Sequence, residues 1–210
     1  MTIEPVVFVV EDDPAVRGTI EQLIQGTSRP VKCFDSAESF LAVSDWSCPG
    51  CLILDVRMPG MSGMELLEKL FSEGIQLPVI MITGHGDIPL TVRAMKKGAF
   101  EFLEKPYRPG HLLETVERAI HLDSKFRQQS VRRQVVEMKI NRLTNKERMV
   151  LKGLLTGRTN QDIASELDVS LRTVQHRRTT IMKKMEVESK AELSDLVFPV
   201  AWPEKVSVEE

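Results

Sequence analysis

Acidic, hydroxyl and basic side chains directly follow four apolar segments in the first half of the chain. The segments are residues 6–10, 51–54, 79–82 and 100–103, and the polar residues after them are Glu11-Asp12-Asp13, Asp55, Thr83 and Lys105-Pro106. Several carboxylates brought together without an arginine would repel one another. A hard divalent cation with oxygen ligands relieves that repulsion, and Mg²⁺ (or Mn²⁺) is the ion that we expect.

These residue types suit phosphoryl transfer. A carboxylate beside a divalent cation can attack phosphorus and form an aspartyl phosphate. Thr83 and Lys105 would supply a hydroxyl and an ammonium group to the phosphoryl oxygens. Each acid by itself could equally cap a helix or end a strand in solvent. Capping does not easily explain why the acids share their place at the ends of predicted strands.

The apolar segments predict the sheet that would position these groups. Residues 6–10 are continuously apolar without alternation, which is typical of a strand buried on both faces. Strands are predicted at 6–10, 31–34, 51–54, 79–82 and 100–103, and helices at 14–25, 37–42, 62–71, 88–97 and from about 109. This alternation predicts an α/β doubly wound five-stranded parallel sheet. Its functional site is expected at the carboxyl ends of the strands.

Composition places the chain among ordinary globular proteins. It has 210 residues, 42% of them hydrophobic and 28% charged, with a formal net charge of −2. No apolar run approaches the roughly 20 residues of a transmembrane helix, and the N-terminus lacks a signal-peptide pattern. We therefore expect a soluble cytoplasmic protein with no membrane partner. Cys48-Pro-Gly-Cys51 lacks the second cysteine pair of a zinc site, so we interpret it as two loop cysteines ahead of a strand.

The near-zero net charge conceals an asymmetry between the two halves of the chain. Residues 1–122 carry a net charge of −6, whereas 123–142 carry +4 and 143–198 carry +2. An acidic half joined to a basic half indicates two separate functions and an anionic partner for the basic half. We predict an acidic domain at 1–122, a basic helical linker at 123–142, a second domain at 143–200 and a tail at 201–210.

The linker is predicted to be helical because no glycine or proline interrupts residues 111–152. The last helix of the first domain could therefore run on to residue 141. Val131, Val135 and Met138 fall on one face of this helix, at spacings of four and three. Such a stripe could dock on a domain or pair with a second copy of the chain.

The second half predicts a small all-α domain. Thr144 and Glu147 form a capping box for a helix that runs to Thr156, with Gly157 after it. Further helices are predicted at 160–167, 171–186 and from Ser189, where a second capping box begins. Two short helices joined by residues 168–170 form a helix-turn-helix candidate.

The helix at 171–186 is basic on one face. Residues 171–185 contain five basic residues and no acid, and the polar face holds Arg172, Gln175, His176, Thr179 and Lys183. Such a face suits the DNA major groove, where Gln can read adenine and Arg can read guanine. A basic face exposed only to solvent is the alternative, although such faces usually include Glu for ion pairs one turn away.

The first half resembles the receiver domain of bacterial two-component response regulators. The resemblance covers residues 5–122 and depends on four motifs: residues 9–14 around Asp12, 54–60 around Asp55, 82–87 with Thr83, and Lys105-Pro106. It implies the flavodoxin-like strand order 2-1-3-4-5. It also implies that Asp55 accepts a phosphoryl group from the phosphohistidine of a sensor histidine kinase.

Further roles follow from this resemblance alone. It implies that Mg²⁺ binds Asp12, Asp55 and the backbone carbonyl of Arg57, with Glu11 acting through water. Lys105 would hold the phosphoryl group, and a cis bond is expected before Pro106. Thr83, Phe102 and Pro106 would be the switch residues. Glu11 departs from the Asp that is usual in the family. Arg57 and His85 could control the access of water to the phosphate, or could simply be exposed.

Residues 143–197 resemble the LuxR/NarL-type DNA-binding domain through the patterns at 143–151, 160–167 and 173–185. The resemblance implies that Gln175, His176 and Thr179 meet base edges and that Lys183 and Lys184 lie near phosphates. Arg177 stands where His is usual, and Gln161 where Lys is common. The combination of receiver, linker and output domain is most similar to the FixJ branch of response regulators.

The sequence thus predicts a transcription regulator that phosphorylation switches, that dimerises when phosphorylated, and that acts on double-stranded DNA and RNA polymerase. It would be no enzyme beyond self-phosphotransfer and autodephosphorylation. Two alternatives stay open. An Asp-nucleophile phosphatase would need an acid two residues after Asp55, where Arg57 stands. In the other alternative, the protein binds DNA without regard to phosphorylation and uses its receiver only for dimerisation. The unusual Glu11 is the sequence feature that favours this alternative.

Overall fold

A computed structural model describes residues 4–42, 48–84 and 88–201, with side chains to residue 199. The chain divides into two compact units, 1–127 and 128–210, and each is described by itself. The division falls inside the predicted linker. His85 and most of the tail, 202–210, lie outside the described residues.

The first unit is a parallel sheet of five strands. The strands are β1 (Val6–Val10), β2 (Val31–Phe34), β3 (Gly50–Asp55), β4 (Val79–Thr83) and β5 (Glu101–Glu104). They pair in the order β2-β1-β3-β4-β5, which confirms the predicted topology. Every residue of β1, β3 and β4 is buried, as their unbroken apolar character predicts.

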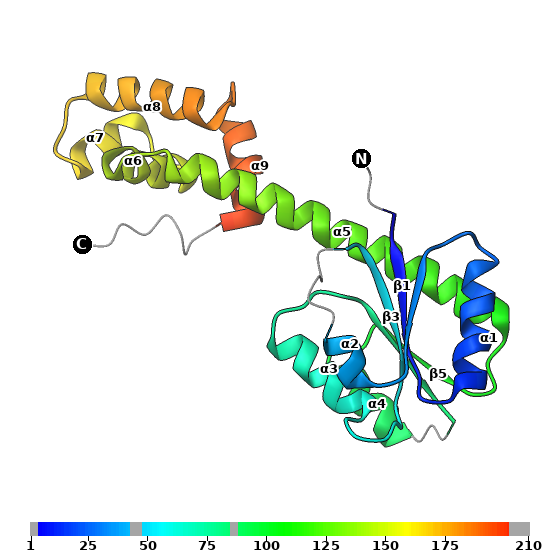
Figure 1. The fold of residues 1–210 in the computed structure, drawn as a ribbon. Coiled ribbons are helices and arrows are strands. Elements are labelled where there is room, and N and C mark those ends of the chain that lie inside the picture. Colours follow the sequence, from blue (N-terminus) through cyan, green and yellow to red (C-terminus); the bar gives the residue numbers. More distant parts are fainter. Residues whose placement is uncertain (1–3, 43–47, 85–87, 202–210) are drawn as a thin grey trace. The chain divides into compact units, whose positions relative to one another are not determined.

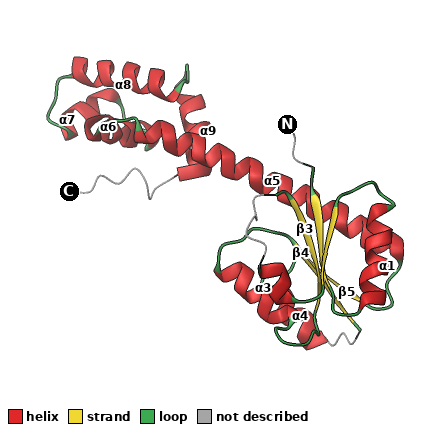
Figure 2. Cartoon of the chain, viewed as in Figure 1, coloured by secondary structure: helices red, strands yellow, loops and turns green. Residues whose placement is uncertain are grey.

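Helices cover both faces of the sheet (Figures 1 and 2). They are α1 (Pro14–Gln25), α2 (Ala37–Leu41), α3 (Gly63–Ser72), α4 (Ile88–Lys96) and α5 (Pro109–Asn141). Residues of α1 and α5 share one core with one face of the strands, and residues of α2, α3 and α4 share the other. This arrangement leaves the carboxyl ends of the strands open for a site.

Strands β3 and β4 each end one residue later than predicted, which affects the position of the site residues. Strand β3 includes Asp55 and β4 includes Thr83, so each is the last residue of its strand rather than the first residue after it. In the paired register Asp55 lies opposite Ile82, and Thr83 lies opposite Glu104. The backbone ladder therefore holds both predicted site residues in place.

Helix α5 continues to Asn141 without a break, as the lack of Gly and Pro predicts. Its first part belongs to the first unit, where Oδ2 of buried Asp123 accepts from the Gly50 amide at 2.9 Å and from Arg127 at 2.7 Å. Its last part belongs to the second unit, where Val136 and Ile140 are buried in the core.

The predicted apolar stripe of the linker is not the face that packs. Val131, Val135 and Met138 are 60%, 39% and 55% exposed. The neighbouring face packs instead, because Val136 and Ile140 lie four residues apart and both contribute to the second core. The stripe with spacings of four and three is therefore not the side that docks on the second unit, and its pairing with a second copy of the chain stays a prediction.

The second unit is helical. Its further helices are α6 (Asn145–Leu155), α7 (Asn160–Glu166), α8 (Leu171–Met185) and α9 (Lys190–Ala201). Thr144 forms the predicted capping box with Glu147, and Gly157 has the positive φ of +82° expected after the helix. At α9 the box is incomplete, because the Glu192 carboxylate accepts from the amide of Glu188 and not from that of Ser189.

Along the described segments, no helix is both long and apolar enough to cross a membrane.

Candidate functional site

Asp55 lies at the carboxyl end of the central strand β3 and is only 6% exposed. Its Oδ1 atom lies 2.8 Å from Nζ of Lys105, and its Oδ2 atom accepts a 2.6 Å hydrogen bond from the amide of Arg57. The same Lys105 ammonium lies 2.7 Å from Oε2 of Glu11. Three residues far apart in sequence therefore meet around one ammonium group.

The electrostatics of the cluster follow from burial and pairing. Burial is the largest influence on Glu11 and raises the pKa of its carboxyl, with the nearby Asp55 charge adding to the rise and Lys105 opposing it. Burial would lower the pKa of Lys105, but its hydrogen bonds and charge interactions with Asp55 and Glu11 outweigh this and raise it. Lys105 is therefore held firmly in its charged form.

The acidic residues fit a divalent cation. One ligand oxygen from each of Glu11, Asp12 and Asp55 lies within 4.8 Å of the other two, and Asp12 is the most exposed of the three. Three carboxylates against one Lys105 ammonium leave about two negative charges uncompensated when all three acids are ionised. Oxygen donors with this residual charge match the preference of Mg²⁺.

Two features of the backbone support these carboxylates. Arg17 donates to the carbonyl oxygens of Glu11 at 2.7 Å and Asp12 at 3.1 Å, which fixes the turn after β1. Asp13 is the N-cap of α1 and accepts from the amides of residues 15 and 16. Asp13 therefore caps a helix, which was the alternative role for these acids, whereas Glu11 and Asp12 lie close to Asp55. The sequence offered no signal for Arg17, because its role depends on the path of the turn.

The start of α3 packs directly on the backbone of the phosphoacceptor candidate. A Cβ atom placed on Gly63 would lie 2.0 Å from the carbonyl oxygen of Asp55, so only glycine fits there. The amide of Gly63 donates to the carbonyl of Val56 at 3.0 Å. Ser62 and Glu65 form the predicted capping box that begins this helix. The sequence motif after Asp55 therefore positions both the acid and the helix beside it.

Two predicted switch residues lie on β4, which pairs with the Asp55 strand β3, and on β5, which lies beyond β4. Thr83 is 1% exposed, and its carbonyl accepts from the amide of Lys105 at 2.7 Å. Phe102 is partly buried against the core under α3 and α4. The bond between Lys105 and Pro106 is cis, as expected. Arg57 has an exposed side chain, while its predicted companion His85 falls outside the described residues.

The helix-turn-helix candidate is formed by α7 and α8. Asp168 adopts a left-handed conformation with φ of +47°, and Ser170 caps α8 by accepting from the amide of Thr173. Val174, Ile181 and Met185 are buried, whereas Leu171, which we expected beside them, is 39% exposed. Helix α8 therefore attaches to the second core along one face only.

The opposite face of α8 is accessible. The predicted DNA-contacting residues that are exposed are Arg172, Gln175, His176, Thr179 and Lys183. Arg177 is only partly exposed. This arrangement presents a cationic and amide-bearing surface of the kind that enters a major groove.

Lys184 differs from its neighbours, because its ammonium group is used inside the second unit. Its Nζ atom lies 2.8 Å from Oε2 of Glu147 and 3.2 Å from the carbonyl oxygen of Arg142. A DNA phosphate at Lys184 would have to compete with this ion pair. The sequence pattern correctly predicted that Lys184 lies on the basic helix. It could not show that the Lys184 side chain contacts Glu147 on α6.

The three cysteines are free thiols. Cys48 lies in a loop as predicted, but Cys51 is a buried residue of β3 and not a loop residue. Burial raises the pKa of the Cys51 thiol to about 12. A thiol so far from ionisation is a poor nucleophile and a poor metal ligand, which agrees with a structural role.

Comparison with known proteins matches both halves of the chain. The family model of the response regulator receiver domain matches residues 7–117, and that of the bacterial regulatory proteins of the luxR family matches residues 141–197. One match falls within each compact unit.

Individual relatives match over nearly the whole length. The response regulator protein TmoT of Ectopseudomonas mendocina is 42% identical over 90% of this chain and 86% of its own. The transcriptional regulatory protein FixJ of Bradyrhizobium diazoefficiens is 37% identical over 94% and 97%. The solved structure of the response regulator StyR is 42% identical, with a TM-score of 0.81 over 93% of this chain and 98% of that one. The chain therefore belongs to the response regulators that join a receiver domain to a LuxR-type DNA-binding domain, in the FixJ branch, and it is a regulator of transcription.

Proposed function

We propose that Asp55 accepts a phosphoryl group from the phosphohistidine of a sensor histidine kinase in a Mg²⁺-dependent reaction, and that the phosphorylated chain dimerises and binds double-stranded DNA. The observation that carries the proposal is the Lys105 ammonium between Asp55 and Glu11, at 2.8 Å and 2.7 Å. It supports a site built for an acid that gains further negative charge.

Asp55 would act as the nucleophile. One of its carboxylate oxygens forms a bond to phosphorus while the bond from phosphorus to the kinase histidine breaks, and the histidine nitrogen leaves with that electron pair. Glu11, Asp12, Asp55 and the backbone carbonyl of Arg57 would hold Mg²⁺ (or Mn²⁺). The bound ion would neutralise charge on the phosphoryl oxygens.

Lys105 and Thr83 would hold the product. Lys105 already faces Asp55, so its ammonium can pair with a phosphoryl oxygen as the Asp55 carboxylate loses its own charge to the new bond. The Thr83 hydroxyl would supply a second donor from the end of β4. The phosphoryl group brings a charge of about −1.5 to −2, which would bias Thr83 and Phe102 between two arrangements and so favour dimerisation or domain release.

DNA binding would use the exposed face of α8. Gln175, His176 and Thr179 would meet base edges, while Arg172, Arg177 and Lys183 would add base or phosphate contacts. Two copies would read a pseudo-palindromic site. Contact with RNA polymerase would then convert binding into regulation in the cytoplasm.

We do not propose turnover of a separate substrate. The chemistry is limited to self-phosphotransfer and autodephosphorylation, because the position two residues after Asp55 holds the cationic Arg57 in place of a general acid. A phosphatase on this sheet would need such an acid.

The test combines mass and DNA affinity. DNA ligands would be selected from a random pool with the phosphorylated protein and then titrated against phosphorylated, unphosphorylated and Asp55→Asn protein. We expect phosphorylation to raise affinity at least tenfold and to double the mass in sedimentation, with no response from Asp55→Asn. Equal affinity and equal mass in all three would contradict the switch and favour the DNA-binding reading in which phosphorylation is irrelevant. Loss of sequence preference in Gln175→Ala would support readout by α8.

A further inference from the structure

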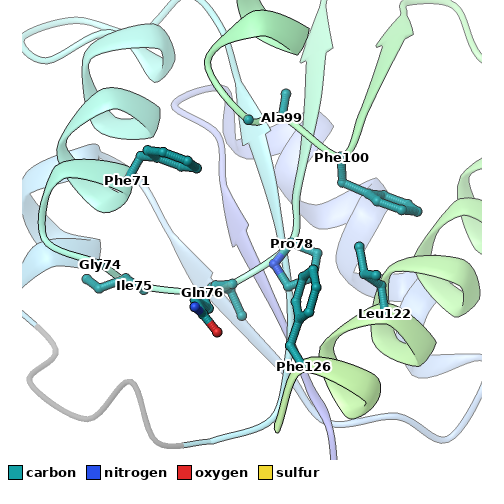
Figure 3. A pocket seen from close by; sticks show the side chains of 11 residues that line it. Phe71, Gly74, Ile75, Gln76, Pro78, Ala99, Phe100, Leu122 and Phe126 are labelled. Carbon is teal, nitrogen blue, oxygen red and sulfur yellow. The ribbon is translucent and has the colours of Figure 1, made fainter. Parts of the chain in front are cut away.

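An apolar cavity of about 610 Å³ opens in the first unit, between the end of α3, the segments that lead into β4 and β5, and α5 (Figure 3). Its lining includes Phe71, Gln76, Leu77, Phe100, Leu122 and Phe126. None of its lining residues, all within the described part of the chain, is charged. Its volume falls within the range of about 300–1,000 Å³ that is typical of sites for small molecules.

This cavity is separate from the phosphorylation site. It lies where β4 and β5 begin, whereas Asp55 and Thr83 end β3 and β4. A strand rises by about 3.3 Å per residue, so the first and last residues of the five-residue strand β4 are roughly 13 Å apart. Occupation of the cavity would therefore leave the carboxylates around Lys105 accessible.

The walls of the cavity are fixed by other contacts. The Phe71 ring covers Gly98, where a Cβ atom would lie only 2.7 Å from the ring. On the opposite wall, α5 is tied to the start of β3, because Asp123 accepts from the Gly50 amide at 2.9 Å and Arg127 donates to the Cys48 carbonyl at 2.7 Å. These bonds lie one residue after Leu122 and Phe126 respectively, so they hold both wall residues in place. The α5 wall is therefore in place before a ligand binds, whereas the Phe71 ring opposite it is 69% exposed.

The chemistry of the wall defines the ligand class. Figure 3 shows the rings of Phe71, Phe100 and Phe126 around the space, from three different segments of the chain. Phenyl rings interact favourably with other aromatic rings in offset and edge-to-face arrangements. Without a charged lining residue, an ionised ligand would lose its hydration and gain no partner. The Gln76 amide can offer a hydrogen bond to one polar substituent.

We propose that this cavity binds a neutral aromatic small molecule of one or two rings. The concave shape favours such a ligand over a second copy of the chain, because a stable protein interface needs about 800 Å² from each partner. The ligand would contact Leu122 and Phe126 on α5, the helix that continues into the second unit. It would therefore stabilise the first unit and give the regulator a site that phosphorylation does not use.

The probe for the test is N-phenyl-1-naphthylamine, a neutral aromatic dye that fluoresces when it leaves water. It would be titrated into the full chain and two cavity variants. Gln76→Trp places a large side chain at an exposed lining position, and Phe126→Ser removes a ring that is 38% exposed. Ile88→Ser is the matched control, because Ile88 is an apolar residue with 81% exposure outside the cavity. Circular dichroism would confirm that each variant is folded. If Phe126→Ser does not fold, the Gln76→Trp variant alone is sufficient for the test.

We expect saturable binding of one dye per chain to wild type and to Ile88→Ser, and affinity at least tenfold weaker in the cavity variants. Bound dye should also raise the melting temperature of wild type. Non-saturable binding, unchanged affinity in folded Gln76→Trp, or loss of binding in Ile88→Ser alone would each overturn the proposal. The last result would place the dye on the exposed face of α4.

Discussion

The ammonium nitrogen of Lys105 lies 2.8 Å from Oδ1 of Asp55, across the end of the intervening strand β4. The same nitrogen reaches Glu11 at 2.7 Å, so one cation joins carboxylates from the ends of β1 and β3. Because Lys105 is only partly exposed, these contacts are less screened by water than surface ion pairs. The charge of Lys105 therefore controls how strongly the acids attract any other cation.

Removal of that charge should strengthen binding of Mg²⁺. In Lys105→Met, Glu11 and Asp55 lose the ammonium group that pairs with both of them in the described structure. We expect the Kd for Mg²⁺, measured by isothermal titration at pH 8, to fall by about 3- to 10-fold, which corresponds to roughly 1 kcal/mol. Lys97→Met is the control, because Lys97 pairs with Glu68 instead. Unchanged or weaker binding in Lys105→Met would contradict the electrostatic account.

Gly63→Ala should destabilise the first unit. The new methyl group would lie 2.0 Å from the Asp55 carbonyl oxygen, so either α3 or the end of β3 must move. We expect the free energy of unfolding in urea to fall by about 2–4 kcal/mol. Gly110→Ala is a matched control within α5, where an added Cβ meets no atom within 4 Å. That variant should be neutral or up to about 1 kcal/mol more stable. Equal stability of the two variants would show that α3 does not pack on Asp55 this closely.

Lys183 and Lys184 should differ in their effect on DNA binding, although they are neighbours. Lys183 is exposed on α8, whereas Lys184 pairs with Glu147. We expect Lys183→Gln to reduce the slope of log affinity against log salt by about one unit, with little change in stability. Lys184→Gln should instead lower the melting temperature and leave the slope nearly unchanged. The reverse pattern would return Lys184 to the phosphate-contacting role that its family resemblance implied.

The pairing of Glu147 predicts a dependence of stability on pH. Burial would raise the pKa of Glu147, but Lys184 and the amide and hydroxyl of Thr144 together lower it below 4.5. A carboxyl with a lower pKa in the folded state adds stability above its unfolded value and loses it as the pH falls through the folded value. Glu147→Gln should therefore cost about 1–3 kcal/mol at pH 7.

That cost should shrink as the pH falls from 4.5 through the lower pKa that Glu147 has in the folded protein, where its carboxylate gains a proton. Urea unfolding followed by circular dichroism at pH 7, 5 and 3 measures the difference between the two proteins. A difference that stays constant down to pH 3 would mean that shape, rather than the charge of Glu147, supports α6 and α8.

The sheet and its acidic site were predictable because each depends on local pattern. Continuous apolar runs predict buried strands, and parallel strands bring their carboxyl ends to one edge of the sheet. Glu11 and Asp55 follow from that rule without knowledge of any distance. The position of Lys105 between them depends on the order of the strands, which the family resemblance supplied and the structure confirms.

Other features could not be predicted because they depend on which side of a helix meets its neighbour. The spacing of Val131, Val135 and Met138 defines a stripe, but only the packed second unit shows that Val136 is buried instead. Lys184 lies on a basic helix by sequence, yet its partner Glu147 is 37 residues away. Long-range pairs of this kind leave no periodic signal.

The most direct test of the central claim is the intact mass of the protein after incubation with Mg²⁺ and acetyl phosphate, with wild type beside Asp55→Asn. Asp55 is the buried acid that meets both Lys105 and the Arg57 amide. We predict a gain of one phosphoryl group in wild type, which is lost when Mg²⁺ is chelated, and no gain in Asp55→Asn. A phosphoryl group on both proteins would contradict the assignment of Asp55, and a gain on neither would contradict phosphorylation at this site.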